Sequence, residues 1–229
     1  MLKTHLIAVF LICSIHAEDY CFGFLNSVAD RKKIPDAEAE EIQKGHMAHM
    51  NRMSKAGHLI AAGPIMSPGA TRGILVYRCK SLEEAREQTS VDPMVINKRL
   101  EVDFHMWRGP KDFGEPLGAQ LRADPNAKYN MVQLPLILLK KTSSWTTDPV
   151  EVLAEHHREI AAMQKAGSVR AVGPVLRSTS LASIMVLSKM PLAEAEKAAK
   201  EMALVRGGYA TVQALLWFVA DESIPVLLQ

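Results

Sequence analysis

The sequence of 229 residues has no surplus of charge of either sign. Its 27 lysine and arginine residues nearly balance its 25 aspartate and glutamate residues, so its formal net charge at pH 7 is only +2. Aromatic residues are also few, at 6%, and no run of lysine and arginine is interleaved with them. A nucleic-acid-binding surface needs a concentrated basic patch. We therefore expect no nucleic acid among the partners of this protein.

Glycine-rich functional motifs are absent as well. Several of the 13 glycines mark the ends of predicted helices and turns, and none forms a phosphate-cradling loop, a dinucleotide-binding fingerprint or a nucleophile elbow. Nothing indicates a bound nucleotide, and we expect no cofactor. With 48% hydrophobic and 23% charged residues, the composition is that of a globular protein, with room for one large domain or two domains of about 100 residues.

The apolar run near the start of the chain is too short to span a membrane. It covers Leu6 to Ile15, about half of the ~20 residues that a bilayer requires. A lysine precedes it, and Ala17 follows as a small residue before two acidic ones, which is typical of a secretory signal peptide over residues 1–17. We therefore expect a secreted or periplasmic protein without membrane contact after cleavage. A retained anchor, or a lipoprotein attached through Cys13, is the weaker interpretation.

The chain repeats itself at an offset of 110 residues. Between positions 46 and 107 this shift gives 16 identities in 62 positions, whereas chance would give about four. The matched motifs include His46 with His156, Lys55-Ala56-Gly57 with Lys165-Ala166-Gly167, Gly63-Pro64 with Gly173-Pro174, and Trp107 with Trp217. Such self-similarity indicates an internal duplication. We predict a first module over residues 18–108, a linker over 109–128, and a second, degenerate module over 129–229.

Each copy has the pattern of one small α+β unit. In the first copy we predict strands near 20–25, 58–64, 73–79 and 100–107, a long helix near 35–57, and a second helix from 81 to about 91. Gly57 is a helix stop signal, and Ser81 with Glu84 forms a capping-box pattern at the start of the second helix. The resulting βαββαβ order is that of a ferredoxin-like module.

A ferredoxin-like module leaves one face of its sheet uncovered, because both helices lie on the other face. The uncovered apolar face must pack on something, and the second module is the nearest candidate. The fold class that we predict is therefore α+β, with two tandem ferredoxin-like modules whose antiparallel sheets pack as an intramolecular α+β barrel. Such a chain can be a monomer that forms an internal pseudo-dimer, or a subunit of a homo-oligomer.

Two cysteines remain outside the predicted signal peptide. Cys21 lies near the start of the first predicted strand and Cys79 at the end of the third. These strands are antiparallel neighbours in a ferredoxin-like module, so their two ends lie close together. A disulfide is therefore one hypothesis for an oxidising compartment. Two separate buried thiols are the other.

One histidine lies on the apolar stripe of the long helix. His46 shares helical spacing with Ile42, Met50 and Met53. Burial removes water from an imidazole and favours its neutral form, so the ring needs a hydrogen-bond partner. A carboxylate would serve as that partner. A neutral imidazole beside a carboxylate is the usual composition of a general base.

Several short motifs occur together in a characteristic order. They are His46-Met-Ala-His-Met-Asn-Arg-Met-Ser-Lys-Ala-Gly57, Ala62-Gly63-Pro64, Leu82-Glu83-Glu84-Ala85, Asp92-Pro93, Arg99-Leu100 and His105-Met106-Trp107. With these motifs the sequence resembles the YCII-related domain family over Tyr20 to Trp107 and, more weakly, over Met131 to Trp217. The resemblance implies a dimeric α+β barrel of ferredoxin-like units in which His46 and Asp92 are the catalytic pair.

The resemblance also implies a class of chemistry. Relatives in this barrel superfamily include muconolactone isomerases, and a chlorinated hydroxyhydroquinone dehydrochlorinase contains similar domains. The implied reaction is a cofactor-independent proton transfer, of isomerase or lyase type, on a small organic acid or phenolic compound. His49, Arg72 and His105 are further candidates for substrate contact. Histidine with carboxylate also suits zinc or iron, but no recognised ligand spacing supports a metal here, and we predict none.

The two copies differ at the candidate site. The second copy keeps His156 but has Met202 in place of Asp92 and Leu215 in place of His105. A histidine without its carboxylate lacks the group that would orient it, so we expect only the first copy to carry chemistry. Lys98 stands where the family has a glycine, which leaves the backbone geometry of the first site open. The alternative function is a non-catalytic module that binds a small ligand or is purely structural.

Overall fold

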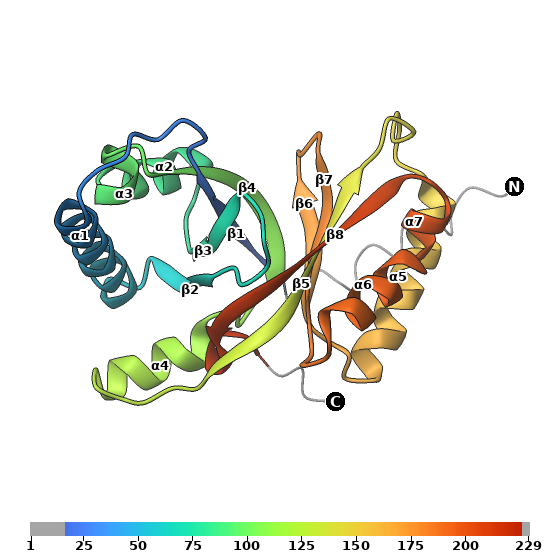
Figure 1. Cartoon of the computed structure of the whole chain (residues 1–229). Helices are drawn as coiled ribbons and strands as arrows, with labels where there is room; N and C mark the ends of the chain where they lie inside the picture. Colours follow the sequence, from blue (N-terminus) through green and yellow to red (C-terminus); the bar gives the residue numbers. More distant parts are fainter. Residues whose placement is uncertain (1–16, 226–229) are drawn as a thin grey trace, which may run out of the picture.

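Two modules with the same order of strands and helices build the structure (Figure 1). The computed structural model describes residues 17–225. The first module comprises β1 (Ala17–Ser27), α1 (Asp36–Lys55), β2 (Leu59–Pro64), β3 (Thr71–Tyr77), α2 (Leu82–Ser90), α3 (Pro93–Ile96) and β4 (Leu100–Pro110). The second comprises β5 (Met131–Lys141), α5 (Val150–Lys165), β6 (Val169–Leu176), β7 (Leu181–Leu187), α6 (Leu192–Lys200), α7 (Ala203–Arg206) and β8 (Ala210–Ala220). Helix α4 (Glu115–Ala123) joins them, and the 3-10 helix η2 (Asp221–Ser223) follows β8.

Alternation of side chains gives each strand two different faces. In β1, Tyr20, Phe22 and Phe24 are buried in the cluster that contains the tryptophans of both modules. Cys21 and Leu25 point the other way, into a cluster that includes residues of α1 and α2. We call the first side the barrel face and the second the helix face.

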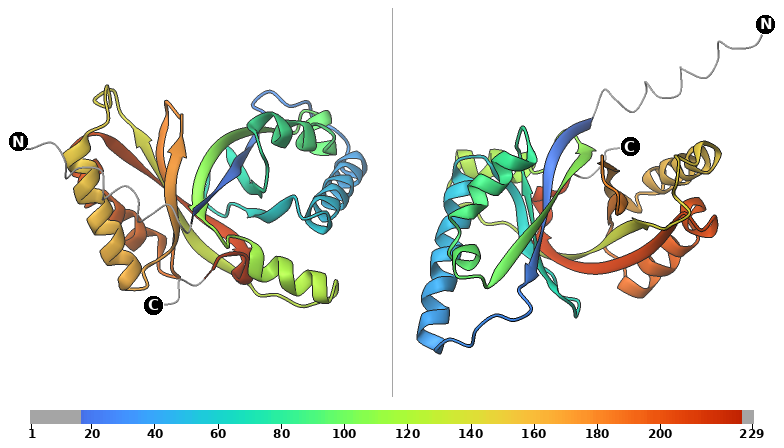
Figure 2. Two further views of the ribbon diagram at one scale, coloured as in Figure 1. Left: turned by 180° about the vertical axis from the view of Figure 1, so that it is seen from behind. Right: turned by 90° about the horizontal axis from the view of Figure 1, so that it is seen from above.

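The strands form one antiparallel sheet that closes on itself. Hydrogen-bonded neighbours follow the order β2-β3-β1-β4-β6-β7-β5-β8. The two ends of this order meet where Ile65, just after β2, pairs with Trp217 of β8, in the same way as Val175 of β6 pairs with Trp107 of β4. Helices α1–α3 and α5–α7 lie on opposite outer sides of the strands (Figures 1 and 2). The predicted pair of ferredoxin-like modules, packed as an intramolecular α+β barrel, is confirmed.

Two glycines let the strands of the two modules approach each other. A Cβ atom at Gly63 would lie 1.9 Å from the backbone oxygen of Phe218, and one at Gly173 would lie 1.7 Å from that of Arg108. No side chain tolerates such distances, so any other residue would push the strands apart. The close approach of the strands also allows a hydrogen bond between the modules, in which Trp107 Nε1 donates to the carbonyl of Gly173 at 3.1 Å. The Gly-Pro and Trp motifs that recur in the sequence therefore serve the closure of the barrel.

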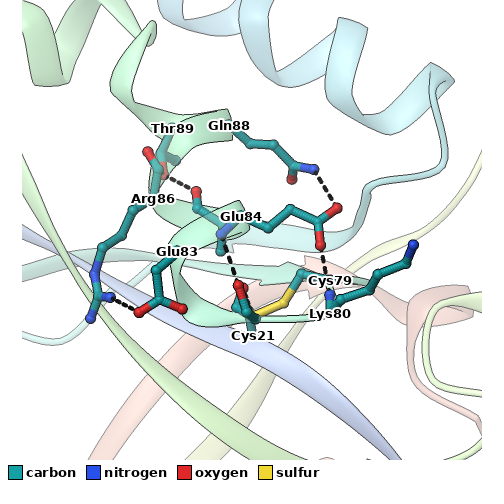
Figure 3. The surroundings of a disulfide bond; sticks show 10 residues. Cys21, Cys79, Lys80, Glu83, Glu84, Arg86, Gln88 and Thr89 are labelled. Atoms are coloured by element: carbon teal, nitrogen blue, oxygen red, sulfur yellow. Dashed lines mark hydrogen bonds and ion pairs between the residues drawn. A yellow bond between two sulfur atoms is a disulfide. The ribbon is translucent and has the colours of Figure 1, made fainter.

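A disulfide fastens β1 to the segment that follows β3. Cys21 and Cys79 are bonded, with their Cα atoms 6.0 Å apart, so the first of the two cysteine hypotheses holds. Figure 3 shows this bond beside the start of α2. The predicted capping box also forms there, since Ser81 Oγ accepts from the Glu84 backbone N–H at 3.2 Å. The Glu84 carboxylate in turn accepts from the backbone N–H of Lys80 at 2.7 Å.

The linker is more ordered than its composition indicated. Glycine, proline and charge over 109–128 predicted a chain that crosses the surface, but α4 occupies Glu115–Ala123. Phe113, just before α4, is fully buried, and its ring packs edge-on against Trp107 with the centroids 5.2 Å apart. The first part of the linker is therefore packed on the barrel core.

The modules differ in the length of their first helix. Helix α1 has 20 residues and α5 has 16. Tyr20 pairs with Trp107 as Leu134 pairs with Trp217, so the first strands correspond at an offset of 114 residues. The offset of 110 residues holds from within the first helix onward, which is the range over which the sequence repeats.

The predicted signal peptide falls almost entirely outside the described residues. Of residues 1–17, only Ala17 is described, as the first residue of β1, where it pairs with Pro110. Within residues 17–225, no helix combines the length and the apolar character needed to cross a bilayer.

Candidate active site

His46 and Asp92 meet where α1 passes the start of α3. His46 Nδ1 lies 2.7 Å from Asp92 Oδ2. Asp92 is fully buried, whereas 11% of the His46 side chain is exposed. The other oxygen of the carboxylate, Oδ1, accepts from the backbone N–H of Met94 at 2.8 Å and so caps α3. Because both oxygens have donors, the carboxylate is held in one orientation toward the imidazole.

Gly45 makes this approach sterically possible. A Cβ atom at this position would lie 2.8 Å from the ring of Pro93, which follows Asp92. A glycine within a helix costs about 1 kcal/mol relative to alanine, so its presence in α1 needs a reason. Here the reason is that α3 packs directly against it. Gly45 was not predicted as part of the site, although Glu155 at the matching position of the second module was a signal in the sequence.

The hydrogen bond decides which nitrogen of His46 is available. A carboxylate only accepts, so Nδ1 carries the hydrogen and Nε2 of the neutral ring keeps its lone pair. Nε2 is therefore the atom that can take a proton. The carboxylate of Asp92 would then stabilise the positive charge on the imidazolium. The His46–Asp92 pair has the geometry of a general base with its orienting group.

Two further polar side chains lie buried beside this pair. His49, one turn after His46 on α1, and Tyr77, at the end of β3, are fully buried. Among residues 17–225, neither the His49 nitrogens nor the Tyr77 hydroxyl has a hydrogen-bond partner. Burial lowers the pKa of His49, against a smaller raising effect of Asp92, and burial and the charge of Asp92 both raise the pKa of the Tyr77 hydroxyl. Both side chains are therefore neutral at neutral pH.

His49 was among the predicted substrate contacts and Tyr77 was not. The structure places both close enough to Asp92 for its charge to act on them. The sequence held one signal for Tyr77, which is that the second module has Leu187 at the matching position. A hydroxyl in one copy and an isobutyl group in the other is a difference that packing alone does not require.

A pocket of about 310 Å³ opens next to the pair. Its lining includes Ile42, one turn before His46 on α1, and Met94, whose N–H is bonded to Asp92. Arg72, a predicted substrate contact, lies in the same lining. His46 and Asp92 are not themselves part of it. The structure therefore brings Arg72 to a pocket that adjoins the pair.

His105 lies on a different side of the sheet. Its ring packs edge-on against Phe24 with the centroids 5.6 Å apart, and its Nε2 lies 3.0 Å from Asp103. Phe24 belongs to the barrel face, whereas His46 lies on a helix over the helix face. The structure thus does not bring His105 to the predicted site. Within residues 17–225, no group of three or more histidine, cysteine, aspartate or glutamate side chains could hold a metal ion.

The turn after the short helix is left-handed in both modules, between α3 and β4 in the first and between α7 and β8 in the second. Lys98 has a φ angle of 50°, and Gly208 at the matching position has 76°. Lysine in place of the family's glycine therefore does not change the backbone geometry that was left open. It costs of the order of 1 kcal/mol, because a Cβ atom is disfavoured in this conformation.

The second module surrounds its histidine differently. His156 is buried without a hydrogen-bond partner among residues 17–225, and Glu159 Oε2 lies 3.9 Å from its Nδ1. Glu159 instead accepts from the backbone N–H of Ala203 at 2.7 Å, at the start of α7, and pairs with Arg206 at 2.9 Å. We expected no carboxylate for this histidine, and that expectation needs a correction. A carboxylate is near, at the position that matches His49, but it is bonded to other groups.

Solved structures with the same barrel have low sequence identity to this chain. A heme-binding protein from Thermus thermophilus has a TM-score of 0.52 and 15% identity, over 90% of this chain and 94% of its own. A mutant chlorite dismutase from Candidatus Nitrospira defluvii has a TM-score of 0.55 and 12% identity, over 90% of this chain and 92% of its own. At such identities the likeness shows the fold alone. No curated protein matches the chain in sequence.

The family comparison is more specific than the likeness in fold. Residues 25–102 match the profile of the YCII-related domain. The matched segment runs from β1 into β4 and contains His46, Asp92 and the turn at Lys98. The first module of this chain is therefore a YCII-related domain.

Proposed function

We propose that the first module is an exported, cofactor-independent enzyme that transfers a proton on a small organic acid or phenolic compound, in a reaction of isomerase or lyase type. The observation that carries the proposal is the buried 2.7 Å hydrogen bond between His46 and Asp92. The match to the YCII-related domain over the same residues supports it. The pocket beside the pair offers space for a small substrate.

The proposed step begins with His46 as the base. Nε2 takes a proton from an acidic C–H of the substrate, and Asp92 stabilises the imidazolium through Nδ1. In an isomerisation, the electron pair of the broken C–H bond moves through the substrate and His46 returns the proton to another carbon. In an elimination, the same electron pair forms a double bond, and the leaving group departs with the electron pair of the bond that joined it to the substrate.

The neutral neighbours of the pair suit this step. His49 and Tyr77 are buried and uncharged at neutral pH, so the Asp92 carboxylate is the charged group that the imidazolium meets. In such a poorly hydrated place the attraction between the imidazolium and the carboxylate is stronger than in water. The buried cluster therefore favours the charge that develops when His46 takes a proton.

A heme, which one of the structural neighbours binds, does not suit the residues present here. His156 is the buried histidine whose ring nitrogens are without a partner in the second module. It shares a face of α5 with Leu153 and Ile160, which pack against the second hydrophobic core on the helix face. A porphyrin ring would have to replace that core. The proposed reaction therefore does not involve a heme at His156.

The alternative is a module that binds a small molecule without converting it. One observation favours it, namely that His46 and Asp92 lie next to the pocket lining and not within it. In that case the pair would hold α1 against α3, and Asp92 would serve as the cap of the short helix.

Two variants separate these functions. Small acids and phenols that raise the melting temperature of the protein are first identified, because a ligand that binds only the folded state must stabilise it. Each is then incubated in D₂O, and exchange of its acidic C–H or formation of product is followed by proton NMR. We expect His46→Ala and Asp92→Asn to lower the rate about 10²–10⁴-fold. Asn keeps an oxygen to cap α3 but removes the negative charge.

The matched control is His156→Ala, which removes the corresponding histidine of the second module. It should leave the rate unchanged. Ligand binding without exchange or product in the wild-type protein would favour the binding module, and equal rates in wild type and both site variants would refute the assignment of the pair.

A further inference from the structure

Three arginines line the pocket beside the His46–Asp92 pair. Arg31 precedes α1, Arg72 lies in β3 and Arg99 precedes β4. The other lining residues are all uncharged: Ile34, Ala39, Ile42, Gln43, Met94 and Leu100. Three positive charges therefore share a pocket of about 310 Å³ whose lining contains no carboxylate.

These arginines differ from the arginines of this protein that have ionic partners. Within residues 17–225, the arginines that form ion pairs are Arg78, Arg86, Arg108, Arg122, Arg170 and Arg206. Arg31, Arg72 and Arg99 are not among them. Arg99 donates only to a neutral group, the backbone oxygen of Lys32. Like charges around one pocket repel each other, so a bound anion would be stabilised there.

The second module lacks this feature. Ala182 stands at the position of Arg72, and Tyr209 stands at that of Arg99. The segment before α1 contributes the charge of Arg31. The segment before α5 contributes Trp145, which packs against the second hydrophobic core on the helix face. The arginines therefore occur in the module that also has the His46–Asp92 pair.

We propose that this pocket binds a small organic dianion, which carries two carboxylates or a phosphate group. Guanidinium groups bind such oxygens through two parallel hydrogen bonds. Three guanidinium groups around one pocket match a ligand with two anionic ends better than a ligand with one anionic end. This inference rests on the proposed function in one respect, which is that the bound dianion would present its acidic C–H toward His46. Binding itself needs only the arginines.

Calorimetric titration of the full chain with succinate tests the inference. Inorganic phosphate is the second probe and acetate the monoanionic control, all at one low ionic strength because salt screens such contacts. We expect succinate or phosphate to bind and acetate to bind at least tenfold more weakly. Arg72→Gln and Arg31→Gln should each weaken binding about tenfold, as expected for loss of a charge-assisted hydrogen bond. Arg99→Lys should weaken it too, since lysine keeps the charge but loses the paired donors.

The matched control is Arg158→Gln, on the exposed side of α5 in the second module. It removes the same charge far from the pocket and should leave binding unchanged. If neither dianion binds the wild-type protein, or if Arg158→Gln weakens binding as much as Arg72→Gln, the inference is wrong. Phosphate binding without succinate binding would support it and indicate a phosphate ester.

His46→Ala separates this inference from the proposed function. The variant should bind the dianion as the wild type does, because His46 is not part of the lining. Loss of proton transfer with retained binding would support both proposals. If no dianion binds, this inference is wrong. Proton transfer on an uncharged phenol is then judged separately, from the rates of His46→Ala and Asp92→Asn.

Discussion

The two modules share their strand order and helix order but differ in the polar groups between helices and sheet. The first module places His46, His49, Tyr77 and Asp92 there, and the matching residues of the second are His156, Glu159, Leu187 and Met202. Only the histidine on the first helix is the same. The fold therefore does not require the polar cluster of the first module, which makes a role in function the better explanation for it.

The carboxylates of the two modules have different partners. Asp92 bonds to the imidazole of His46 and caps α3, whereas Glu159 caps α7 and pairs with Arg206. One carboxylate in each module thus satisfies the start of the short helix. Only in the first module does the same group also orient a histidine, so acid–base chemistry is expected there alone.

The largest difference in stability should come from the disulfide, because the second module contains no cysteine. Replacing Cys21 and Cys79 with alanine removes a bond across a sequence separation of 58 residues. In the chain-entropy model this destabilises the folded state by about 4 kcal/mol. Urea unfolding followed by tryptophan fluorescence would measure it. An unchanged midpoint in the double variant would show that the bond does not stabilise the fold.

The next difference concerns the unpartnered histidine of the second module. Burial lowers the pKa of His156 to about 4, with a smaller lowering by His157. The unfolded chain therefore binds a proton that the folded chain does not, and stability falls as the pH drops from about 6.5 toward 4. At pH 4.5 the loss relative to pH 7 should be about 2–3 kcal/mol. Urea unfolding at both pH values would measure it.

His156→Leu is the control for this pH dependence, since leucine fills a similar volume and does not titrate. The variant should lose about 2–3 kcal/mol less than the wild type between pH 7 and pH 4.5. An equal loss in both proteins would mean that other groups cause the acid sensitivity.

A smaller effect is expected from the contact between α1 and α3. Gly45→Ala should push Pro93 away and lengthen the hydrogen bond from His46 to Asp92, which lowers turnover about tenfold. The more favourable helix propensity of alanine offsets part of the packing cost, so the melting temperature should change little. The resonance of the His46 Nδ1 hydrogen should shift in the NMR spectrum. Gly118→Ala, in α4, is the matched control and should change neither turnover nor that resonance.

The smallest effect should come from the left-handed turn before β4. Lys98→Gly gives the first module the residue that the second has at Gly208. We expect a gain in stability of about 0.5–1 kcal/mol, because glycine tolerates positive φ without strain. Thermal unfolding measures it. A loss of stability would indicate that the Lys98 side chain makes contacts that outweigh the strain.

Much of the fold could be predicted from local patterns. The βαββαβ order follows from the periodicity of apolar residues, from the helix stop at Gly57 and from the capping pair Ser81 and Glu84, all of which act within a few residues. The resemblance to the YCII-related domain implied that His46 and Asp92 form a pair, and in the structure the two side chains are hydrogen-bonded. Helix α4 was missed because its sequence is rich in the residues that usually mark a surface linker.

The surroundings of the pair could not be predicted in the same way. Tyr77 and Arg99 come from other segments than His46, and their proximity depends on how the strands pair and how the helices pack. His105 was named as a candidate contact without a face of the sheet, because one step along a strand moves a side chain to the other face, and its ring packs on Phe24 of the barrel face.

The sequence by itself determined the two modules, their element order and the chemical types at the candidate site, because periodicity, capping and repetition are properties of neighbouring residues. The tertiary structure alone decided that Gly63 and Gly173 close the barrel, that Gly45 admits α3, and that three arginines share one pocket. These contacts join residues far apart in the chain. Their distances follow from the packing of whole strands and helices, which no local pattern encodes.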